Sequence, residues 1–289
     1  MTRNPYRTDE NTLISLSGGR TSGLMMYKVL EEYDFKLPDY FKVCFANTGK
    51  EMPQTLDFLH KMSQEWGFDL VWLEYAGRDA IPADPENPEA RAKYNSYFNV
   101  VDYKTASRDG KPFEKLLECV GQMPNSVARF CSGQLKIRTM RRYLQSIGWD
   151  SPYIDFIGIR ADEQRRAVKL HGKFSEGRDA FCPLYVDGVT VQDVSDFWKS
   201  HHFDLELPNN NGVNDWGNCD LCFLKGQGKR LSIIRERPDL ADWWIRMEEM
   251  KGDQFDRMGY SYEQARVIAT DQMSMFNTDD ETIPCFCGD

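Results

Sequence analysis

A chain of 289 residues is long enough to bury a sizeable core, as one large domain or as a core domain with a smaller elaboration. Hydrophobic residues make up 41% of it and charged residues 28%, a composition that excludes wholesale disorder. No apolar run approaches the roughly eighteen residues of a membrane span, and the polar N-terminus lacks the apolar segment of a secretory signal. We therefore expect a cytosolic protein with no membrane partner. The net charge of −9 disfavours non-specific coating of nucleic acid.

The first half of the chain alternates between short β-rich runs and segments of helical periodicity. This alternation predicts an α/β fold, a Rossmann-like core with a mostly parallel sheet covered on both faces. Pro53 suits the first turn of one helix, and another helix is expected from Leu135 to Ile147. The predicted strands are Thr12 to Leu16, Phe41 to Ala46, Asp69 to Tyr75 and Tyr153 to Ile159.

The remaining segments divide the chain further. From Ala76 to about Asp109 the sequence is polar and aperiodic, which predicts a long surface insertion, either a lid or a connector. After Gly188 the pattern becomes mainly helical. We expect a nucleotide-binding core over residues 1–185, with its insertion at about 76–110, and a helical C-terminal region over 186–289. The helices predicted there are Val191 to Trp198, Lys229 to Arg235, Leu240 to Met250 and Ser261 to Thr270.

A glycine-containing loop separates the first predicted strand from the helix that follows it. Backbone N–H groups and a helix N-terminus can bind an anion together at such a junction, and hydroxyl groups can donate to phosphate oxygens. The spacing matches neither the P-loop of kinases and GTPases nor the Rossmann dinucleotide fingerprint. The alternative is a plain strand-to-helix turn. The predicted phosphate-binding residues are Ser17, Gly18, Gly19, Arg20, Thr21 and Ser22.

Two other strand ends carry unusual polar sequence, and ligands of open α/β sheets bind at the carboxyl ends of strands. One is Asn47-Thr48-Gly49-Lys50-Glu51, and the other is Gly158-Ile159-Arg160-Ala161-Asp162-Glu163. The alternative interpretation of Glu51, Arg160 and Asp162 is a local ion pair that caps the strand.

Eight cysteines in a reducing compartment favour metal ligation or catalysis over disulfides. Cys219 and Cys222 form a C-x-x-C unit, and Cys131 and Cys182 lie upstream. Four thiolates suit either Zn²⁺ or a [4Fe–4S] cluster, and buried apolar cysteines are a third possibility. Cys44, inside a strand, and Cys119, in an apolar helical stretch, are expected to be core residues.

The three strand-end motifs together resemble the PP-loop adenine nucleotide alpha-hydrolase superfamily, in its phosphoadenosine phosphosulfate reductase-like branch. The glycine loop reads S-G-G-x-x-S, and the matching segments follow in order over roughly the first 200 residues. The resemblance implies a five-stranded or similar core that binds ATP or a phosphoadenosine nucleotide across the strand ends. It also implies that Asn47, Thr48 and Gly49 contact the nucleotide, that Arg160 neutralises phosphate charge and that Asp162 or Glu51 holds Mg²⁺.

The same resemblance favours an iron-sulfur cluster over zinc. Members of this branch, including the ATP-pyrophosphatase component of DNA phosphorothioation, combine an upstream Cys-Lys segment with a later C-x-x-C. True sulfonucleotide reductases use a C-terminal cysteine followed by glycine, which Cys287-Gly288 matches weakly. Cys285 is an added partner, and the acidic residues before it would raise the pKa of a thiol there.

Our leading hypothesis is an ATP pyrophosphatase that adenylylates an acceptor for sulfur transfer, with a sulfur donor protein as a possible partner. Eleven basic residues against five acidic ones between Ser126 and Arg178 raise a nucleic acid acceptor as a further hypothesis, whereas the alternative is a solvated face with neutralising neighbours. The other two hypotheses are a phosphoadenosine phosphosulfate or adenosine phosphosulfate reductase with Cys287 as nucleophile, and a non-catalytic nucleotide-binding regulator. The sequence also resembles uncharacterised reductase-like proteins often encoded by bacteriophages and prophages.

Overall fold

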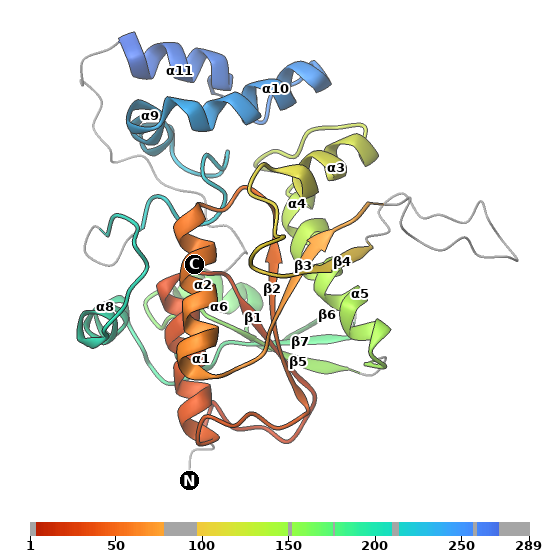
Figure 1. Cartoon of the computed structure of the whole chain (residues 1–289), viewed down its shortest axis with the longest axis vertical. Helices are drawn as coiled ribbons and strands as arrows, with labels where there is room; N and C mark the ends of the chain where they lie inside the picture. The colour runs from red at the N-terminus through yellow and green to blue at the C-terminus, as the bar shows by residue number, and fades with distance from the viewer. Residues whose placement is uncertain are drawn as a thin grey trace, which may run out of the picture.

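The computed structural model describes residues 4–77, 97–149, 152–175, 177–209, 214–256 and 259–271. A sheet occupies the centre, and Figure 1 shows α1 and α2 running side by side along it. The helices are α1 (Arg20–Glu32), α2 (Pro53–Trp66), α3 (Lys111–Cys119), α4 (Phe130–Ser132), the π-helical turn η1 (Gly133–Arg138), α5 (Thr139–Ser146), α6 (Gln164–Leu170), α7 (Pro183–Val186), α8 (Val191–Ser200), α9 (Gln227–Glu236), the 3₁₀ turn η2 (Pro238–Leu240), α10 (Ala241–Lys251) and α11 (Tyr262–Asp271).

The described residues form a seven-stranded sheet in the order β4-β3-β2-β1-β5-β7-β6. The five inner strands are mutually parallel, and the two outer ones, β4 and β6, pair antiparallel. The predicted α/β class and mostly parallel sheet are therefore confirmed. The strands are β1 (Thr12–Leu16), β2 (Phe41–Asn47), β3 (Leu70–Tyr75), β4 (Phe98–Val101), β5 (Tyr153–Ile157), β6 (Lys173–Ser175) and β7 (Arg178–Phe181).

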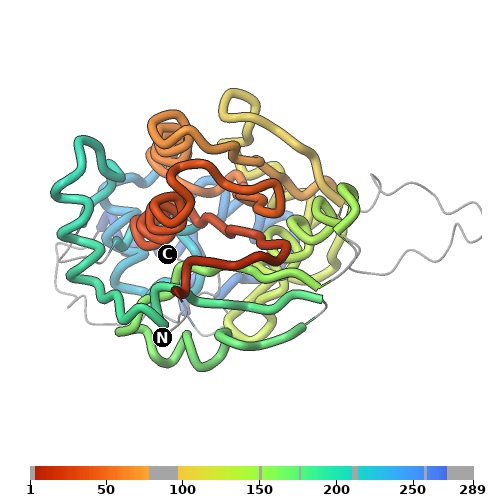
Figure 2. The backbone as a smooth tube through the Cα atoms, turned by 90° about the horizontal axis from the view of Figure 1, so that it is seen from below, coloured from red at the N-terminus to blue at the C-terminus, as the bar shows by residue number. Residues whose placement is uncertain are grey.

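Alternate residues of β1 point to opposite faces of the sheet, so β1 helps to build two separate cores. Ile14 and Leu16 belong to the large cluster that includes residues of α1, α2 and α8. Leu13 belongs instead to a smaller cluster with Met140 and Leu144 of α5. Figure 2 shows α8 beyond α1 at one side of the molecule.

Helix α6 covers the same face as α5, but farther along the sheet. Leu13 pairs with Asp155 in register, and Ile157 follows two residues later on the same face as Asp155. Ile157 packs in a third cluster with Ala167 of α6 and Ala180 of β7. Two small clusters therefore share this face, and polar residues of β1, β5 and β7 lie between them.

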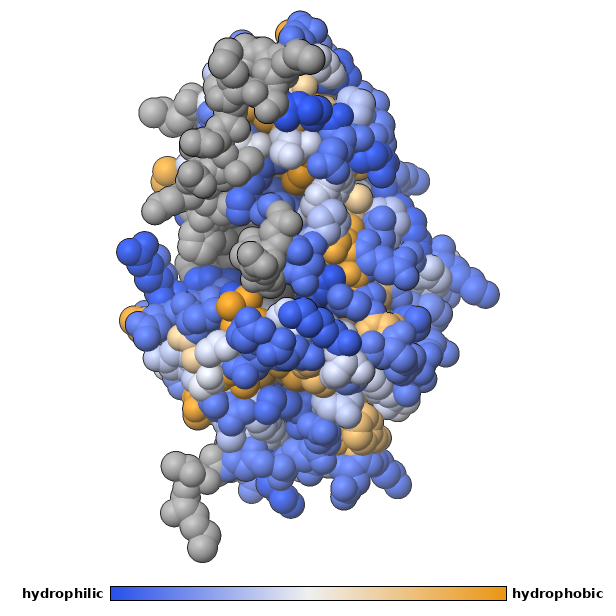
Figure 3. All heavy atoms as spheres, turned by 90° about the vertical axis from the view of Figure 1, so that its left-hand side faces the viewer, coloured by the Kyte–Doolittle hydropathy of each residue, from blue (hydrophilic) through white to orange (hydrophobic). Residues whose placement is uncertain are grey.

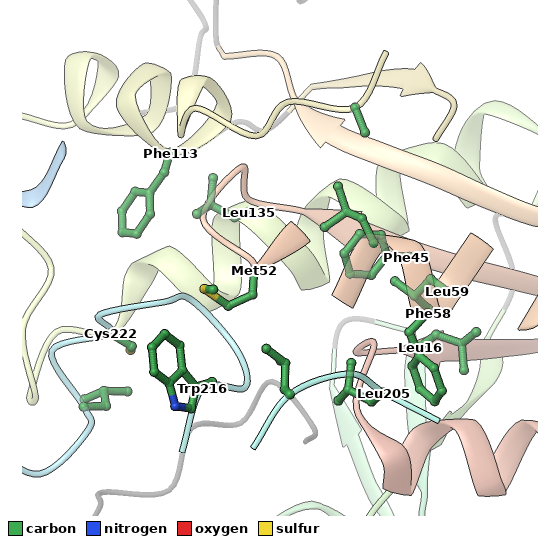
Figure 4. Packing of buried hydrophobic residues seen from close by; sticks show 14 of the residues in the cluster. Leu16, Phe45, Met52, Phe58, Leu59, Phe113, Leu135, Leu205, Trp216 and Cys222 are labelled. Carbon is green, nitrogen blue, oxygen red and sulfur yellow. The ribbon is translucent and has the colours of Figure 1, made fainter. Parts of the chain in front are cut away.

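The C-terminal helices α9, α10 and α11 lie beyond the carboxyl end of β2 (Figure 1). Their common centre is aromatic: Trp244 stacks on Tyr262 at 5.0 Å between ring centroids, and Phe255 meets Trp244 at 4.9 Å. Trp243 and Trp244 of α10 are both buried in this core. The large cluster includes residues of the sheet and of these helices. Figure 4 shows the part of it that reaches from Leu16 and Phe45 to Trp216 and Cys222.

Three expectations about elements need correction. The segment predicted as an insertion contains β4, whose four residues are too few to show a periodicity and are only half-buried. The helix expected at Leu135 begins earlier and passes through η1. Helix α6 and strands β6 and β7 were not predicted. Residues 78–96 lie outside the described ranges.

None of the described helices combines the length and apolar character needed to cross a membrane. Figure 3 shows one face of the molecule, covered mostly by hydrophilic residues with small separate apolar areas.

Candidate functional site

The glycine loop joins β1 to α1 and leaves the N-terminus of α1 without a side-chain cap. Gly19 is the N-cap residue, with extended backbone angles, and no side chain accepts a hydrogen bond from the first turn. The first N–H groups of a helix have no intrahelical acceptor. Gly18 has φ of 81°, a left-handed conformation that favours glycine, and a Cβ there would overlap Thr55 of α2. The loop thus presents unsatisfied donors and the positive end of a helix dipole.

The hydroxyl groups of the loop bond within it. Ser17 Oγ lies 3.0 Å from Ser22 Oγ and accepts a hydrogen bond from the Gly19 N–H at 3.3 Å. Ser22 Oγ donates to the Gly19 carbonyl at 3.0 Å. We expected these hydroxyls to donate to phosphates, whereas here they fix the shape of the loop.

Arg20 requires a correction, because its side chain binds another part of the protein. Its Nε and Nη2 donate to Asp204 at 2.7 and 2.9 Å, and the side chain is 9% exposed. Arg20 therefore ties the segment after α8 to α1 through Nε and Nη2. Neither Asp204 nor this anchoring role was predicted from the sequence.

The segment after β5 lies against the first turn of α1. Arg160 Nη1 donates to Thr21 Oγ1 at 3.0 Å. Gly158 permits the approach, because a Cβ there would lie 2.9 Å from the Ser22 Cα. Arg160 also pairs with Asp162 at 3.0 Å and Glu163 at 3.6 Å, so the local ion pair considered as the alternative interpretation is present.

The order of the strands places a topological switch point at this site. The chain runs from β1 to β2 and β3 on one side, and β5 then adds on the other side of β1. Ligands of open α/β sheets bind outside the carboxyl ends of strands at such a point. The glycine loop and Arg160 flank it.

The Asn47–Glu51 loop after β2 is a closed structure. Asn47 is fully buried, and its Nδ2 donates to Glu74 Oε1 at 2.6 Å and to the Ser107 carbonyl at 2.8 Å. Its Oδ1 accepts from the Gly49 N–H at 3.1 Å. Gly49, with φ of 77°, packs so closely that a Cβ would lie 2.9 Å from Gly110 Cα. The expectation that the Asn47 side chain contacts a nucleotide needs correction, since its polar atoms are used internally.

Glu51 and Thr48 meet the C-x-x-C segment. Glu51 Oε2 accepts from the Thr48 N–H at 2.9 Å and from Thr48 Oγ1 at 2.7 Å. The backbone of Glu51 forms a bridge with Cys219, and its Oε1 lies 3.4 Å from Lys136 Nζ. Oε1 is buried and accepts no hydrogen bond within the described structure. Asp162 is elsewhere, beside Arg160 and the Val191 N–H, so the two proposed Mg²⁺ ligands do not share a site.

Three of the four predicted metal ligands line one pocket. Cys131 of α4 faces it together with Cys219 and Cys222. Phe113 and Leu135 supply apolar walls, and Figure 4 shows both near Cys222. As these side chains lie, no three metal-ligating residues of the described ranges converge closely enough to hold an ion.

Cys182 is a correction to the predicted four-cysteine set. It is fully buried in the cluster beneath α6 and lies beside His171, whose Nδ1 accepts from its N–H at 3.2 Å. Burial raises the pKa of its thiol to about 12. Sequence spacing could not show that Cys131 joins the C-x-x-C unit and Cys182 does not, because both cysteines lie far upstream of that unit in the chain. Cys44 is fully buried in β2, as predicted, whereas Cys119 at the end of α3 is only half-buried.

The thiol of Cys219 is strongly affected by its surroundings. Burial, and then the charge of Glu51, raise its pKa well above the usual value of 9.0, while Lys136 acts in the opposite direction. Thr48 Oγ1 lies 3.5 Å from its sulfur. Asn218, with φ of 59°, turns the backbone just before it.

A buried ion pair that sequence reasoning missed joins the closed loop to the C-x-x-C segment. Lys50 Nζ lies 2.8 Å from Asp220 Oδ2, and the two side chains are only 7% and 5% exposed. Asp220 also accepts from Trp244 Nε1 at 2.8 Å. The pair therefore connects β2, the thiol pocket and α10.

Several basic residues expected to form a surface are paired with carboxylates. Lys136, Arg160, Arg166 and Arg178 each have such a partner. This favours the interpretation of neutralising neighbours for that part of the stretch. Cys285 and Cys287 lie outside the described residues.

Comparison with known proteins adds one relative. No known family model matches the chain. The chain is similar to the uncharacterized nin region protein ORF290 of Escherichia phage lambda, with 27% identity over 219 residues that cover 75% of this chain and 67% of that protein.

Proposed function

We propose that the chain is an ATP pyrophosphatase of the PP-loop kind, which holds an adenine nucleotide at the glycine loop and adenylylates an acceptor. The supporting observation is the uncapped N-terminus of α1, which lies at the switch point between β1 and β5 with Arg160 bonded to its first turn. Backbone donors and a helix dipole suit phosphates there, and a guanidinium adds charge where a pyrophosphate would leave.

The proposed reaction is a displacement at the α-phosphorus of MgATP. An acceptor oxygen forms a bond to this phosphorus as the bond to the bridging oxygen of the β-phosphate breaks, and pyrophosphate leaves with the electron pair. The α1 donors stabilise the charge that grows on the leaving group. A sulfur nucleophile, supplied as sulfide or by a donor protein, then displaces AMP from the activated acceptor.

The thiol pocket is the proposed metal centre. Soft thiols favour zinc or an iron-sulfur cluster, and Cys131, Cys219 and Cys222 would be the protein ligands. Such a centre would bind sulfur close to Lys136 and Glu51. Cys182 is not a ligand in the proposed metal centre, because it lies in the cluster beneath α6.

The test of the reaction is product analysis by purified protein incubated with MgATP, and separately with phosphoadenosine phosphosulfate. We expect AMP and pyrophosphate in equal amounts from ATP. Sulfite from phosphoadenosine phosphosulfate, lost on Cys287→Ser, would instead support the reductase hypothesis. Tight nucleotide binding without any product would support the regulator.

The test of the metal centre compares cysteine variants after anaerobic purification. Cys131→Ser, Cys219→Ser and Cys222→Ser should each lower bound iron or zinc at least several-fold. Cys182→Ala is the matched control and should retain the wild-type metal content, because its thiol lies in another cluster. Metal lost equally in the control would contradict the three-thiol site.

A further inference from the structure

A second pocket opens on the sheet face that carries α5 and α6, between the two small clusters. It begins at Ser17 of the glycine loop and follows β1 back to Leu13. The five extended residues from Leu13 to Ser17 span roughly 13 Å, so the pocket is a groove that starts at the proposed nucleotide site and runs along the sheet. Ile137 and Met140 form one apolar wall.

A polar chain forms the floor of this groove. Ser15 Oγ donates to Asp155 Oδ1 at 2.6 Å, and Arg178 Nε donates to the other oxygen of Asp155. Asp155 is 4% exposed and Arg178 is 15% exposed. A buried carboxylate that holds one edge of a guanidinium fixes its orientation and leaves the outer edge for another acceptor.

The outer edge of Arg178 is not used by the protein in the described ranges, where Nε alone has a hydrogen-bond acceptor. Lys136 also lines the groove, and its charge is balanced by Glu51 at 3.4 Å. An apolar groove with a preoriented guanidinium suits a ligand that has an apolar body and an oxyanion.

We propose that this groove binds the acceptor of the adenylylation, a small organic molecule whose carboxylate or similar oxyanion pairs with Arg178. The identification of the ligand as the acceptor rests on the proposed function, whereas the anion site itself does not. The groove starts at the glycine loop, so an acceptor held there would have its reactive end beside the nucleotide. The ion pairs of Arg160 and Arg166 leave less basic surface for a nucleic acid acceptor.

The experiment measures binding of benzoate and of benzamide, its uncharged analogue, by titration without nucleotide. We expect benzoate to bind at least tenfold more tightly than benzamide, since a charge-assisted pair is worth roughly 10- to 100-fold in affinity. Arg178→Met should remove this preference. Equal binding of the two probes to wild-type protein would overturn the proposal.

Two further variants make the result independent of folding defects in Arg178→Met, which leaves Asp155 unpaired. Ile137→Trp fills the groove from its wall without touching the ion pair, and it should weaken benzoate at least tenfold. Arg165→Met, an exposed position on α6, is the charge-matched control and should change benzoate affinity less than twofold. Loss of benzoate binding in the control, or none in Ile137→Trp, would contradict the groove.

A last experiment distinguishes whether the groove binds the oxyanion of an acceptor or a phosphate of the nucleotide itself. Benzoate is titrated again with saturating adenosine 5′-(β,γ-imido)triphosphate. Simultaneous binding with benzoate affinity unchanged supports an acceptor groove, whereas displacement of benzoate assigns the groove to the nucleotide and overturns the proposal. If the nucleotide analogue fails to bind at all, the proposed function fails, and the assignment of the ligand as an acceptor fails with it, while the benzoate preference still decides the anion site.

Discussion

The glycine loop and the Asn47–Glu51 loop follow neighbouring parallel strands, yet they differ in how their polar groups are used. In the glycine loop, the hydroxyls of Ser17 and Ser22 form hydrogen bonds within the loop, and the first turn of α1 stays uncapped. In the second loop, the amide oxygen and nitrogen of Asn47 form hydrogen bonds within the protein, and Lys50 forms a buried ion pair with Asp220. A polar segment at a strand end can therefore be either a ligand-binding loop or a structural loop whose polar groups bond within the protein.

The largest expected effect concerns the structural role of the Asn47–Glu51 loop. Lys50→Met leaves the Asp220 carboxylate buried without its cation, so we expect a loss of about 3–5 kcal/mol in the free energy of unfolding. Urea denaturation measures it. Arg246→Met, which breaks the exposed pair with Glu114, is the matched control and should cost less than about 1 kcal/mol. A stable Lys50→Met protein that has lost nucleotide binding would make this loop a ligand site.

Asn47→Ala tests the same loop without removing a formal charge. Glu74 and the Gly49 N–H lose their hydrogen bonds to this side chain, which should cost about 2–4 kcal/mol of stability. Nucleotide affinity of the folded fraction should change little. The comparison of the loops fails if titration calorimetry shows the reverse pattern.

Gly19→Asp tests the glycine loop as a phosphate site, because it should raise the stability of the fold while it lowers the affinity for ATP. The backbone angles of Gly19 suit an N-cap carboxylate, which would stabilise α1 by roughly a few tenths of a kcal/mol relative to glycine. The same carboxylate would occupy the donors and repel phosphates, so we expect ATP affinity to fall roughly 100-fold, equivalent to about 2.7 kcal/mol. Unchanged ATP affinity at a raised melting temperature would place the nucleotide elsewhere.

The smallest effect concerns the thiol pocket in metal-free, reduced protein. Burial and the Glu51 carboxylate hold the pKa of Cys219 high, so its alkylation by iodoacetamide should be slow at pH 8 and rise as the pH increases. Glu51→Gln removes the negative charge, lowers that pKa and should accelerate the reaction a few-fold. The raised pKa also stabilises the fold below about pH 9, and this contribution should be lost as the pH rises further. A slower reaction in Glu51→Gln would reverse the assigned sign.

The sequence was most informative where structure is local. Strands β1 and β2 and the N-terminus of α2 at Pro53 are within a residue of their predicted positions, because apolar runs, glycine and proline act over a few residues. Strand β6 is short and pairs with β7, which follows it closely in the chain, whereas the short strands β4 and β7 pair with β3 and β5, which lie farther away. Their formation is a tertiary effect that no local pattern records.

The site was predictable in its residue types more than in its contacts. Spacing suggested a C-x-x-C site and correctly drew attention to Cys131, but it also grouped Cys182, which the fold places under α6. Arg20 and Asn47 look like ligand residues in the chain, and their partners Asp204 and Glu74 appear only in three dimensions. Lys136, which lines both pockets, gave no separate signal.

The measurement that tests the central claim most directly is the fate of the ATP phosphates in wild-type and Gly19→Asp protein, followed by chromatography of labelled ATP. The proposed site predicts AMP and pyrophosphate in equal amounts from wild-type protein, and at least a large reduction of both from Gly19→Asp with the fold intact. Release of ADP and phosphate, or equal turnover by the two proteins, would contradict a pyrophosphatase built on the N-terminus of α1.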